Sequence, residues 1–232
     1  MARPVPTLEE EHALLDAGAA RVAGVDEVGR GAPAGPVTVG VVVVDASVTE
    51  PLAGVRDSKD LSAAAREALV PAIGAWSVAG AVGHASPAEI DAFGMTNALR
   101  LAGHRALARI GEPTPDVVLL DGHHDWLTVP EQGDLLVLGH PDLVRTGRVV
   151  TRVKADQRCA AVAAASVLAK VTRDAIMVGL AVEHPGYGWE RNKGYASAEH
   201  QDALRRLGPT PLHRLSWNLP EREPSDPTGP SA

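Results

Sequence analysis

The sequence has few aromatic residues, a single cysteine and no long apolar run, and each shortage excludes a class of protein. Aromatic residues make up only 3% of the 232 residues, so the core must be built from Ala, Val, Leu and Ile. The single cysteine, Cys159, cannot form a disulfide within the chain, which is typical of a reducing compartment. The longest apolar run, residues 37–44, is too short to span a bilayer, and the acidic N-terminus lacks the apolar segment of a secretion signal. We therefore expect a cytoplasmic protein that does not associate with membranes.

The charge of the chain is acidic overall but unevenly distributed. The net charge is −7, whereas nucleic-acid-binding proteins are usually basic. Residues 145–173 nevertheless hold seven Lys and Arg against one acid, Asp156. Two interpretations stay open for this stretch: a solvated surface, or a local face that binds phosphate.

The hydrophobic pattern predicts one α/β domain, with helices packed on a mixed sheet. The strands are expected at residues 21–25, 37–44, 77–85, 116–122 and 147–153. The helices are expected over residues 63–74, 86–110, 157–182 and 197–208, with Ser62, Ser86 and Ser197 as N-caps. We assign residues 1–18 to a polar lead-in, 19–219 to the domain with its C-terminal helices, and 220–232 to a disordered tail.

The stretch "GVDEVGRGAPAGPV", residues 24–37, places Asp26 and Glu27 in an apolar context. Burying an unpaired carboxylate is costly, so these side chains need a partner. Neighbours on a regular strand point to opposite faces, so the strand must bulge or end here, or one of the two acids contributes differently, for example through its backbone carbonyl.

Two further acids follow predicted strands. Asp121 ends the strand "VVLLD", and Asp156 follows a strand and precedes a helix. Taken alone, Asp121 is equally well explained as a turn residue and Asp156 as a helix cap. Together with Asp26 and Glu27 they could converge at one edge of the sheet, where α/β proteins form ligand sites.

A cluster of carboxylates points to a bound divalent cation. Packed carboxylates repel one another and resist ionisation, and a cation removes that penalty. Oxygen-only ligands favour Mg²⁺ or Mn²⁺ over zinc. Two such ions can hold a phosphodiester for in-line attack by water without a nucleophilic side chain. The candidate catalytic and metal-binding residues are therefore Asp26, Glu27, Asp121 and Asp156.

The glycines that follow the first strand invite comparison with a dinucleotide-binding loop. Pro33 and Pro36 interrupt the segment where the helix of such a loop would begin, and a strand follows instead. We therefore reject that interpretation, although glycines beside Arg30 would let the backbone approach a ligand closely.

Seven motifs in order resemble the ribonuclease HII family, the prokaryotic type 2 ribonucleases H. They are "GVDEVGRGAPAGPV" at 24–37, "DSKDLS" at 57–62, "LLDG" at 119–122, "KAD" at 154–156, "AAASVLAKVTRD" at 163–174, "NKGYASAEH" at 192–200 and "HRLSW" at 213–217. Each motif alone is modest evidence, but seven in the right order across nearly the whole chain are highly specific.

The resemblance implies a ribonuclease H-like fold, with a mixed five-stranded sheet and a helical C-terminal part. It implies a Mg²⁺- or Mn²⁺-dependent endonuclease that hydrolyses the RNA strand of RNA–DNA hybrids. It also implies incision of duplex DNA on the 5′ side of embedded ribonucleotides, leaving 3′-hydroxyl and 5′-phosphate ends, in DNA repair and replication.

The resemblance also implies roles for single residues. The four acids match the metal-binding acids of the family. Gly29, Arg30 and Gly31 match the motif that contacts the ribonucleotide and its 2′-hydroxyl, and Tyr195 matches the tyrosine that senses the RNA–DNA junction. The 2′-hydroxyl marks a ribonucleotide within DNA, and a site whose polar groups only that hydroxyl satisfies rejects its absence by ~10⁴–10⁵.

Other residues are expected to contact the substrate backbone. Ser58 and Lys59 are expected to bind phosphate. Lys170 and Arg173 either do the same or occupy an ordinary helix surface. His213 is expected to be structural.

The chain departs from the family pattern between Asp121 and Asp156, which are 35 residues apart. We expect an insertion in this segment, such as an extra hairpin, that leaves the role of Asp156 intact. The C-terminal tail lacks the glutamine-plus-aromatic pattern of a sliding-clamp-binding peptide, so no clamp docking is expected. No feature of the sequence demands more than a monomer.

Two rival functions are less well supported. A catalytically inactive hybrid-binding module on the same fold conflicts with the presence of all four acids. A metal-dependent nuclease or phosphotransferase with another substrate preference conflicts with the intact Gly29-Arg30-Gly31 motif and Tyr195.

Overall fold

The computed structural model describes residues 5–130 and 140–222 and has a mixed five-stranded sheet at its centre. The strands lie in the order β3-β2-β1-β4-β5. Their bounds are β1 Val22–Val28, β2 Val37–Val44, β3 Ala79–Ala85, β4 Val117–Asp121 and β5 Arg148–Arg152. The first three strands pair antiparallel, whereas β4 and β5 run parallel to β1. The expected five-stranded mixed sheet is therefore confirmed.

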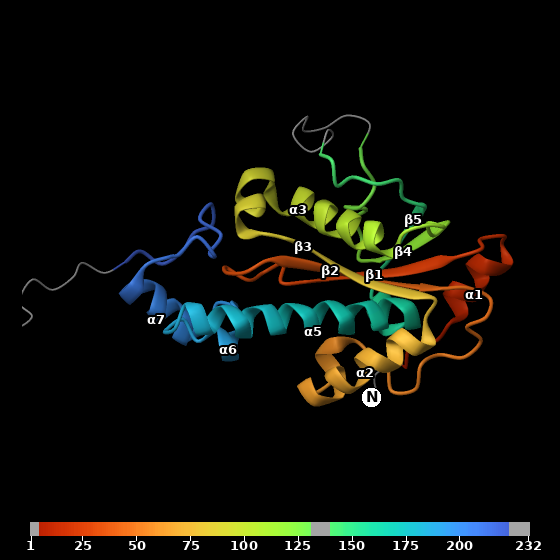
Figure 1. The fold of residues 1–232 in the computed structure, drawn as a ribbon, viewed down its shortest axis with the longest axis horizontal. Helices are drawn as coiled ribbons and strands as arrows, with labels where there is room; N and C mark the ends of the chain where they lie inside the picture. Colours follow the sequence, from red (N-terminus) through yellow and green to blue (C-terminus); the bar gives the residue numbers. More distant parts are fainter. Residues whose placement is uncertain (1–4, 131–139, 223–232) are drawn as a thin grey trace, which may run out of the picture.

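Helices cover both faces of the sheet (Figure 1). α3 (Pro87–Ile110) lies on one face, and α5 (Ala160–Glu183) lies on the other together with α2 (Ala63–Trp76). The short α6 (Trp189–Asn192) and α7 (Ala198–Leu207) form the helical C-terminal part beyond the end of the sheet. Two 3₁₀ helices, η1 (Ser58–Asp60) and η2 (Ala155–Gln157), precede α2 and α5. None of the helices within the described ranges is long and apolar enough to cross a membrane.

The core on both faces of the sheet consists mainly of aliphatic side chains, with Trp126 buried on the α3 face. All eight residues of β2 are buried, which fits its nearly continuous run of valine. Gly24 on β1 allows α5 to pack closely, because a Cβ atom there would overlap the backbone of Ala161 and Val162. The absence of that one side chain lets α5 run directly across the central strand.

The helix starts confirm the predicted caps. The hydroxyl of Ser62 accepts from the Ala65 amide, and that of Ser197 accepts from the His200 amide. Ser86 forms a full capping box with Glu89, with Pro87 as the first helical residue. The long helix predicted from residue 157 begins at Ala160 instead, because η2 occupies residues 155–157.

The polar lead-in is joined to the start of α5. α1 (Glu9–Asp16) places the buried Glu11 against this helix, where Glu11 Oε1 accepts from the Ala161 amide at 2.8 Å. The Thr7 amide donates to the Arg158 carbonyl at 2.8 Å, and the Ala160 amide donates to the Thr7 carbonyl at 2.8 Å. The N-terminal segment therefore holds the backbone that directly follows Asp156.

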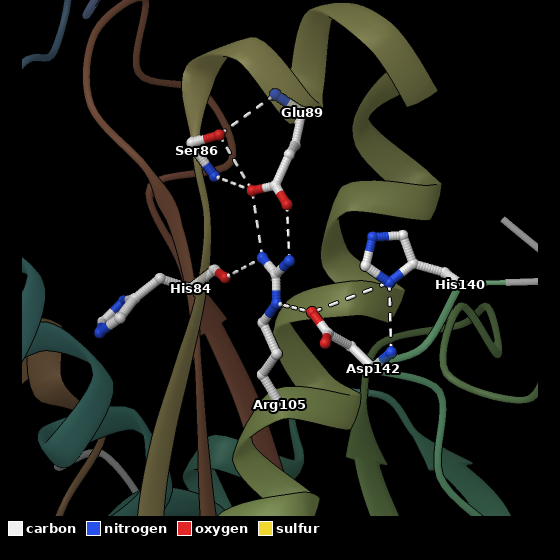
Figure 2. Close-up of polar contacts among 6 residues, drawn as sticks. All are labelled: His84, Ser86, Glu89, Arg105, His140 and Asp142. Atoms are coloured by element: carbon white, nitrogen blue, oxygen red, sulfur yellow. Dashed lines mark hydrogen bonds and ion pairs between the residues drawn. The ribbon is translucent and has the colours of Figure 1, made fainter. Parts of the chain in front are cut away.

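The segment between β4 and β5 docks on α3. His104 Nε2 lies 3.0 Å from the Leu127 carbonyl, and His104 Nδ1 accepts from the Val144 amide at 3.0 Å. Figure 2 shows the second anchor: Arg105 donates to Glu89, to the His84 carbonyl and to Asp142. Residues 123–130 and 140–147 contain no strand, and the rest of the expected hairpin lies outside the described residues.

Candidate active site

Asp26 and Asp121 lie side by side on neighbouring parallel strands. The pairing of β1 with β4 ends at Val25 and Leu120, and the two aspartates are the next residues in register. Val22 and Leu119 pack in the core cluster that contains the first turns of α5. Because side chains alternate along a strand, Asp26 and Asp121 project toward this same face. The predicted convergence of these two acids is therefore present.

Asp156 reaches the same place from η2, which follows β5. Its side chain is buried, and the Asp121 carboxylate holds the preceding residue by accepting from the Ala155 amide at 2.7 Å. Asp156 does not cap α5, whose N-cap is Cys159. Asp121 thus serves partly as a structural acceptor, as a turn aspartate would, while it also faces Asp26.

Asp57 is a fifth acid at the site that sequence reasoning missed. It is buried, and its carboxylate caps η1 by accepting from the Lys59 amide at 3.0 Å. The Lys59 ammonium lies 3.8 Å from Asp57 Oδ2 and 3.6 Å from Asp156 Oδ2. The available signal was the acid that opens the "DSKD" motif, directly before Ser58 and Lys59.

The cluster is electrostatically strained. Burial raises the pKa of Asp26 well above its usual value, and Glu27, Asp121 and Asp156 raise it further. Burial, together with Asp121 and Asp57, raises the pKa of Asp156 to about 6. Burial lowers the pKa of Lys59, but the surrounding carboxylates outweigh this effect and raise it overall. These shifts are the repulsion that a bound cation would relieve.

Glu27 occupies a different position from the other acids. β1 pairs regularly with β2 through Val28, so the strand contains no bulge and ends one residue beyond Glu27. By the strand alternation, Glu27 projects toward the α3 face, away from Asp26. Its Oε1 lies 3.4 Å from Arg30 Nη1, and its buried Oε2 has no hydrogen-bond partner among the described residues. Burial raises the pKa of Glu27 even though Arg30 lowers it.

The donor chemistry fits Mg²⁺ or Mn²⁺, but the side chains are not drawn together around a single point. Within residues 5–130 and 140–222, no three His, Cys, Asp or Glu side chains are already placed to hold one metal ion. The oxygen-only donors, the raised pKa of Asp26 and the unpartnered Glu27 Oε2 all fit a divalent cation. Side-chain movements of Asp26, Asp121 and Asp156 would be needed to hold it.

The Gly29–Gly31 turn follows these acids directly in the chain. Gly29 has a φ of 84°, in the left-handed region that favours glycine. Arg30 and Gly31 are exposed, and their amides have no intramolecular partner among the described residues. The turn therefore presents backbone donors and one guanidinium to solvent, within three residues of Glu27.

Tyr195 lies near this turn, on the segment that links α6 to α7. The Ala34 amide donates to the Gly194 carbonyl at 3.2 Å, which joins the two loops. Lys170 Nζ lies 5.7 Å and Arg173 Cζ 5.3 Å from the centre of the half-buried Tyr195 ring. The structure thus brings the predicted recognition residues of the two loops together.

The remaining predictions have mixed outcomes. Ser58 is buried and donates its amide to Ser166 Oγ at 3.1 Å, whereas the Lys59 side chain is 77% exposed. Lys170 is paired with Asp174 at 2.8 Å. His213 is confirmed as structural, because it is fully buried and its Nδ1 accepts from the Thr210 amide.

Both expectations for Arg173 are wrong. The side chain is neither on a helix surface nor free for phosphate, because it is fully buried and donates to three backbone carbonyls.

The sheet order and the helices on both faces define a ribonuclease H-like fold, and Asp26 and Asp121 lie side by side on its central strands. The family model described as Ribonuclease HII matches residues 23–219. A ribonuclease HII from Streptomyces coelicolor is 48% identical over 213 residues, which cover 91% of this chain and 83% of that protein.

Solved structures agree with this assignment. The ribonuclease H2 of Pyrococcus horikoshii OT3 superposes with a TM-score of 0.62 and 28% identity, covering 85% of this chain and 94% of that one. The RNase HII of Archaeoglobus fulgidus, solved as a complex with PCNA, has a TM-score of 0.63 and 26% identity, covering 87% and 96%. The chain belongs to the ribonuclease HII family, whose members are metal-dependent endoribonucleases of the ribonuclease H type.

Proposed function

We propose that this protein hydrolyses the RNA strand of RNA–DNA hybrids and incises duplex DNA on the 5′ side of embedded ribonucleotides. The products are a 3′-hydroxyl and a 5′-phosphate, and the reaction serves ribonucleotide removal in DNA repair and replication. One observation carries the proposal: the carboxylate cluster and the Gly29–Gly31 turn are consecutive in the chain. Three residues of extended backbone span only ~10 Å, so a phosphate held at Asp26 lies close to a sugar read by the turn.

The acids of the cluster would have different roles in the cleavage step. Asp26, Asp121 and Asp156 would hold the divalent cations on the α5 face of the sheet. Glu27, which projects toward the α3 face, would have to turn around the end of β1 to join them, and its unpartnered Oε2 is free to do so. When bound, two Mg²⁺ or Mn²⁺ ions supply a water nucleophile and stabilise the charge on the leaving oxygen. Lys59, 3.6 Å from Asp156 Oδ2, supplies a mobile positive charge for a neighbouring phosphate.

The Gly29–Gly31 turn and Tyr195 would recognise the ribonucleotide. The free amides of Arg30 and Gly31 can donate to the 2′-hydroxyl oxygen, which DNA lacks. The exposed Arg30 guanidinium can bind an adjacent phosphate. The Tyr195 ring is placed to pack against a sugar, supported by Lys170 and Arg173 behind it. A deoxyribonucleotide would leave the turn's donors without this acceptor.

The test is to map the cut. A duplex with one ribonucleotide, labelled in separate samples at either end of the ribonucleotide-containing strand, is incubated with Mg²⁺ or Mn²⁺ and compared with a long RNA–DNA hybrid. We expect a single cut 5′ of the ribonucleotide, with a 3′ end that a polymerase extends and a 5′ end that a ligase accepts. A cut on the 3′ side, or ends that neither enzyme accepts, would overturn the proposal. Binding without cleavage would favour the inactive hybrid-binding module.

The proposal extends to the state of the protein in the cell. We propose a cytoplasmic monomer that acts without a sliding-clamp peptide. The lack of a glutamine-plus-aromatic pattern in the C-terminal sequence supports the second point, although residues 223–232 lie outside the described residues. Light scattering of the purified chain, alone and mixed with a sliding clamp, tests both points.

A further inference from the structure

Two arginines beside the Gly29–Gly31 turn, here called the recognition turn, are fully buried, and neither is paired with any carboxylate that the structure describes. Arg173 on α5 and Arg214 near the C-terminus have no exposed surface. Neither forms an ion pair with an acid within the described part of the chain, whereas burying a guanidinium is costly unless its donors are satisfied. Arg173 donates from Nε, Nη1 and Nη2 to backbone carbonyl oxygens of the loops that carry Gly29–Gly31 and Tyr195. Arg214 donates to such carbonyls from Nη1 and Nη2, whereas its buried Nε has no hydrogen-bond partner among the described residues.

Arg214 binds the recognition turn on its buried side through the carbonyls of the turn. It donates to the carbonyls of Gly29 at 2.5 Å and Arg30 at 2.8 Å, and more weakly to Gly35 at 3.3 Å. Its guanidinium carbon lies 4.7 Å from the centre of the Trp217 ring, a cation–π contact that favours this position of the guanidinium. The turn's carbonyls therefore point inward to Arg214, while the amides of Arg30 and Gly31 stay free.

Arg173 connects the recognition turn to residues 193–196, the segment that carries Tyr195 and is here called the tyrosine loop. It donates to the carbonyls of Ala34 at 3.0 Å and Pro36 at 2.8 Å on one side, and to Lys193 at 2.9 Å on the other. Its guanidinium carbon also lies 5.3 Å from the centre of the Tyr195 ring. One side chain thus touches both loops of the recognition site.

The two arginines, the recognition turn and the tyrosine loop are packed closely against one another. A Cβ atom on Gly29 would overlap Arg173 Nε, so only glycine lets the guanidinium pass beneath the turn. A Cβ atom on Gly194 would lie 2.5 Å from the Ala34 carbonyl oxygen. A small displacement of either arginine must therefore move the turn, the tyrosine loop or both.

We propose that Arg173 and Arg214 are positioning residues that fix the spacing between the Gly29–Gly31 turn and the Tyr195 ring, and that this spacing sets the preference for a ribonucleotide over a deoxyribonucleotide. The inference rests on the proposed function of the turn and the tyrosine. Neither arginine touches the substrate, since both are covered and act through backbone carbonyls. Lysine keeps the charge but cannot reproduce the planar fork that reaches three carbonyls.

The test compares Arg173→Lys and Arg214→Lys with the wild-type protein. Kd is measured without divalent cation for a single-ribonucleotide duplex and for the matched all-DNA duplex, and kcat and KM are measured for the first with Mg²⁺. We expect the binding preference for the ribonucleotide to fall at least ~10-fold in both variants, because displaced amides would lose the hydrogen bond to the 2′-hydroxyl that distinguishes the two duplexes. Affinity for the all-DNA duplex should change less than about twofold, since phosphate contacts carry it.

The matched control is Arg105→Lys. Arg105 also makes several hydrogen bonds in a partly buried setting, but it lies on α3 and holds Glu89 and Asp142 (Figure 2). This variant should keep the wild-type binding preference. Hydrogen exchange gives a second readout: the segments 28–36 and 193–196 should exchange faster in both test variants and not in the control.

The outcomes separate the possible explanations. A purely structural role would reduce the folded fraction and so weaken binding of both duplexes equally, which would overturn the proposal. An unchanged preference in folded Arg173→Lys and Arg214→Lys would also overturn it. If the lysine variants do not fold, Trp217→Leu loosens Arg214 more mildly and should lower the preference in the same direction; an unchanged preference there counts against the proposal. A wild-type protein without any preference would instead refute the proposed function of the turn.

Discussion

At the scale of single residues, the acids of the active site oppose folding. Asp26 is buried with three carboxylates around it, and Lys59 is the cation that acts on it. Its folded pKa lies above the unfolded value, so its ionisation favours the unfolded chain, increasingly as pH rises above about 4. Such a conflict between stability and function is common at active sites.

Asp26→Asn should therefore raise stability while removing activity. In the metal-free protein at pH 8 we expect a gain of ~1–2 kcal/mol, seen as an increase in Tm of about 2–8 °C, and a smaller gain at pH 5. Cleavage should fall by at least ~10³-fold, because a ligand of the cations is lost. Scanning calorimetry in EDTA and single-turnover cleavage measure the two effects.

The control for this prediction is Asp16→Asn, an exposed acid in α1. It should leave cleavage unchanged and alter Tm by less than the Asp26 variant does. A drop in Tm for Asp26→Asn would show that the charged form of Asp26 supports the fold, contrary to the electrostatics described above.

Buried histidines predict a weakness of the fold in acid. His213 Nε2 lies 3.1 Å from His200 Nε2, which also accepts from Trp189 Nε1. Burial and the neighbouring His200 lower the pKa of His213 to about 4. A lowered histidine pKa means that the unfolded chain binds the proton better, so stability should fall as pH drops from about 6.5 to about 4.

The measurement is Tm against pH for the wild-type protein and His213→Asn. The wild-type Tm should fall more steeply over this range than that of the variant, whose side chain does not titrate. Parallel curves for the two proteins would show that His213 does not carry the acid sensitivity.

At the scale of helices and strands, close approach of α5 to β1 is the feature most open to test. Gly24→Ala should destabilise the protein by ~1–3 kcal/mol or more, because the new Cβ atom would overlap the α5 backbone. Gly179→Ala makes the same change on α5, where no atom lies within 4 Å, and should stabilise by up to ~1 kcal/mol. Urea unfolding of both variants compares them directly, and equal effects would contradict the close packing described here.

The elements whose signals are local were predictable. The three serine N-caps and the valine-rich β2 follow from neighbouring residues, and the structure confirms them. The kink of α3 at Gly94, with a φ of 75°, was missed because helical periodicity continues across such a local departure. The two 3₁₀ helices were missed because three residues are too few to show a periodicity.

The acids of the site that lie on the strands β1 and β4 were predictable. Each of Asp26 and Asp121 follows an apolar run in the sequence, and in the structure the pairing of β1 with β4 stops just before both. The position of Arg173 was not, because its partners are carbonyls of residues that lie more than 130 positions away for two of three bonds. Every residue carries a backbone carbonyl, so the sequence does not show which residues accept from an arginine. In the sequence, a buried arginine with such partners therefore looks the same as a surface arginine.

At the scale of the whole molecule, the segment between β4 and β5 is attached to the face opposite α5. Arg105 holds it through Asp142, and the same guanidinium holds the pKa of Glu89 at about 2 (Figure 2). Arg105→Met should cost ~1–3 kcal/mol of stability, because Glu89 and Asp142 lose their partner. The single-ribonucleotide kcat/KM should stay within about twofold of wild type.

Urea unfolding and steady-state kinetics of this one variant test both halves of that statement. A large loss of activity in folded Arg105→Met would show that the segment communicates with the carboxylates across the sheet.

The acids of the active site should cleave only where the Gly29–Gly31 turn binds a 2′-hydroxyl. The most direct measurement is kcat/KM for a duplex with one ribonucleotide against the same duplex with deoxyribose at that position, in Mg²⁺ and in Mn²⁺. We expect a ratio of at least ~10⁴, because the bound duplex would cover the amides of the Gly29–Gly31 turn and leave them unpaired where the 2′-hydroxyl is missing. Comparable cleavage of the two duplexes would contradict it.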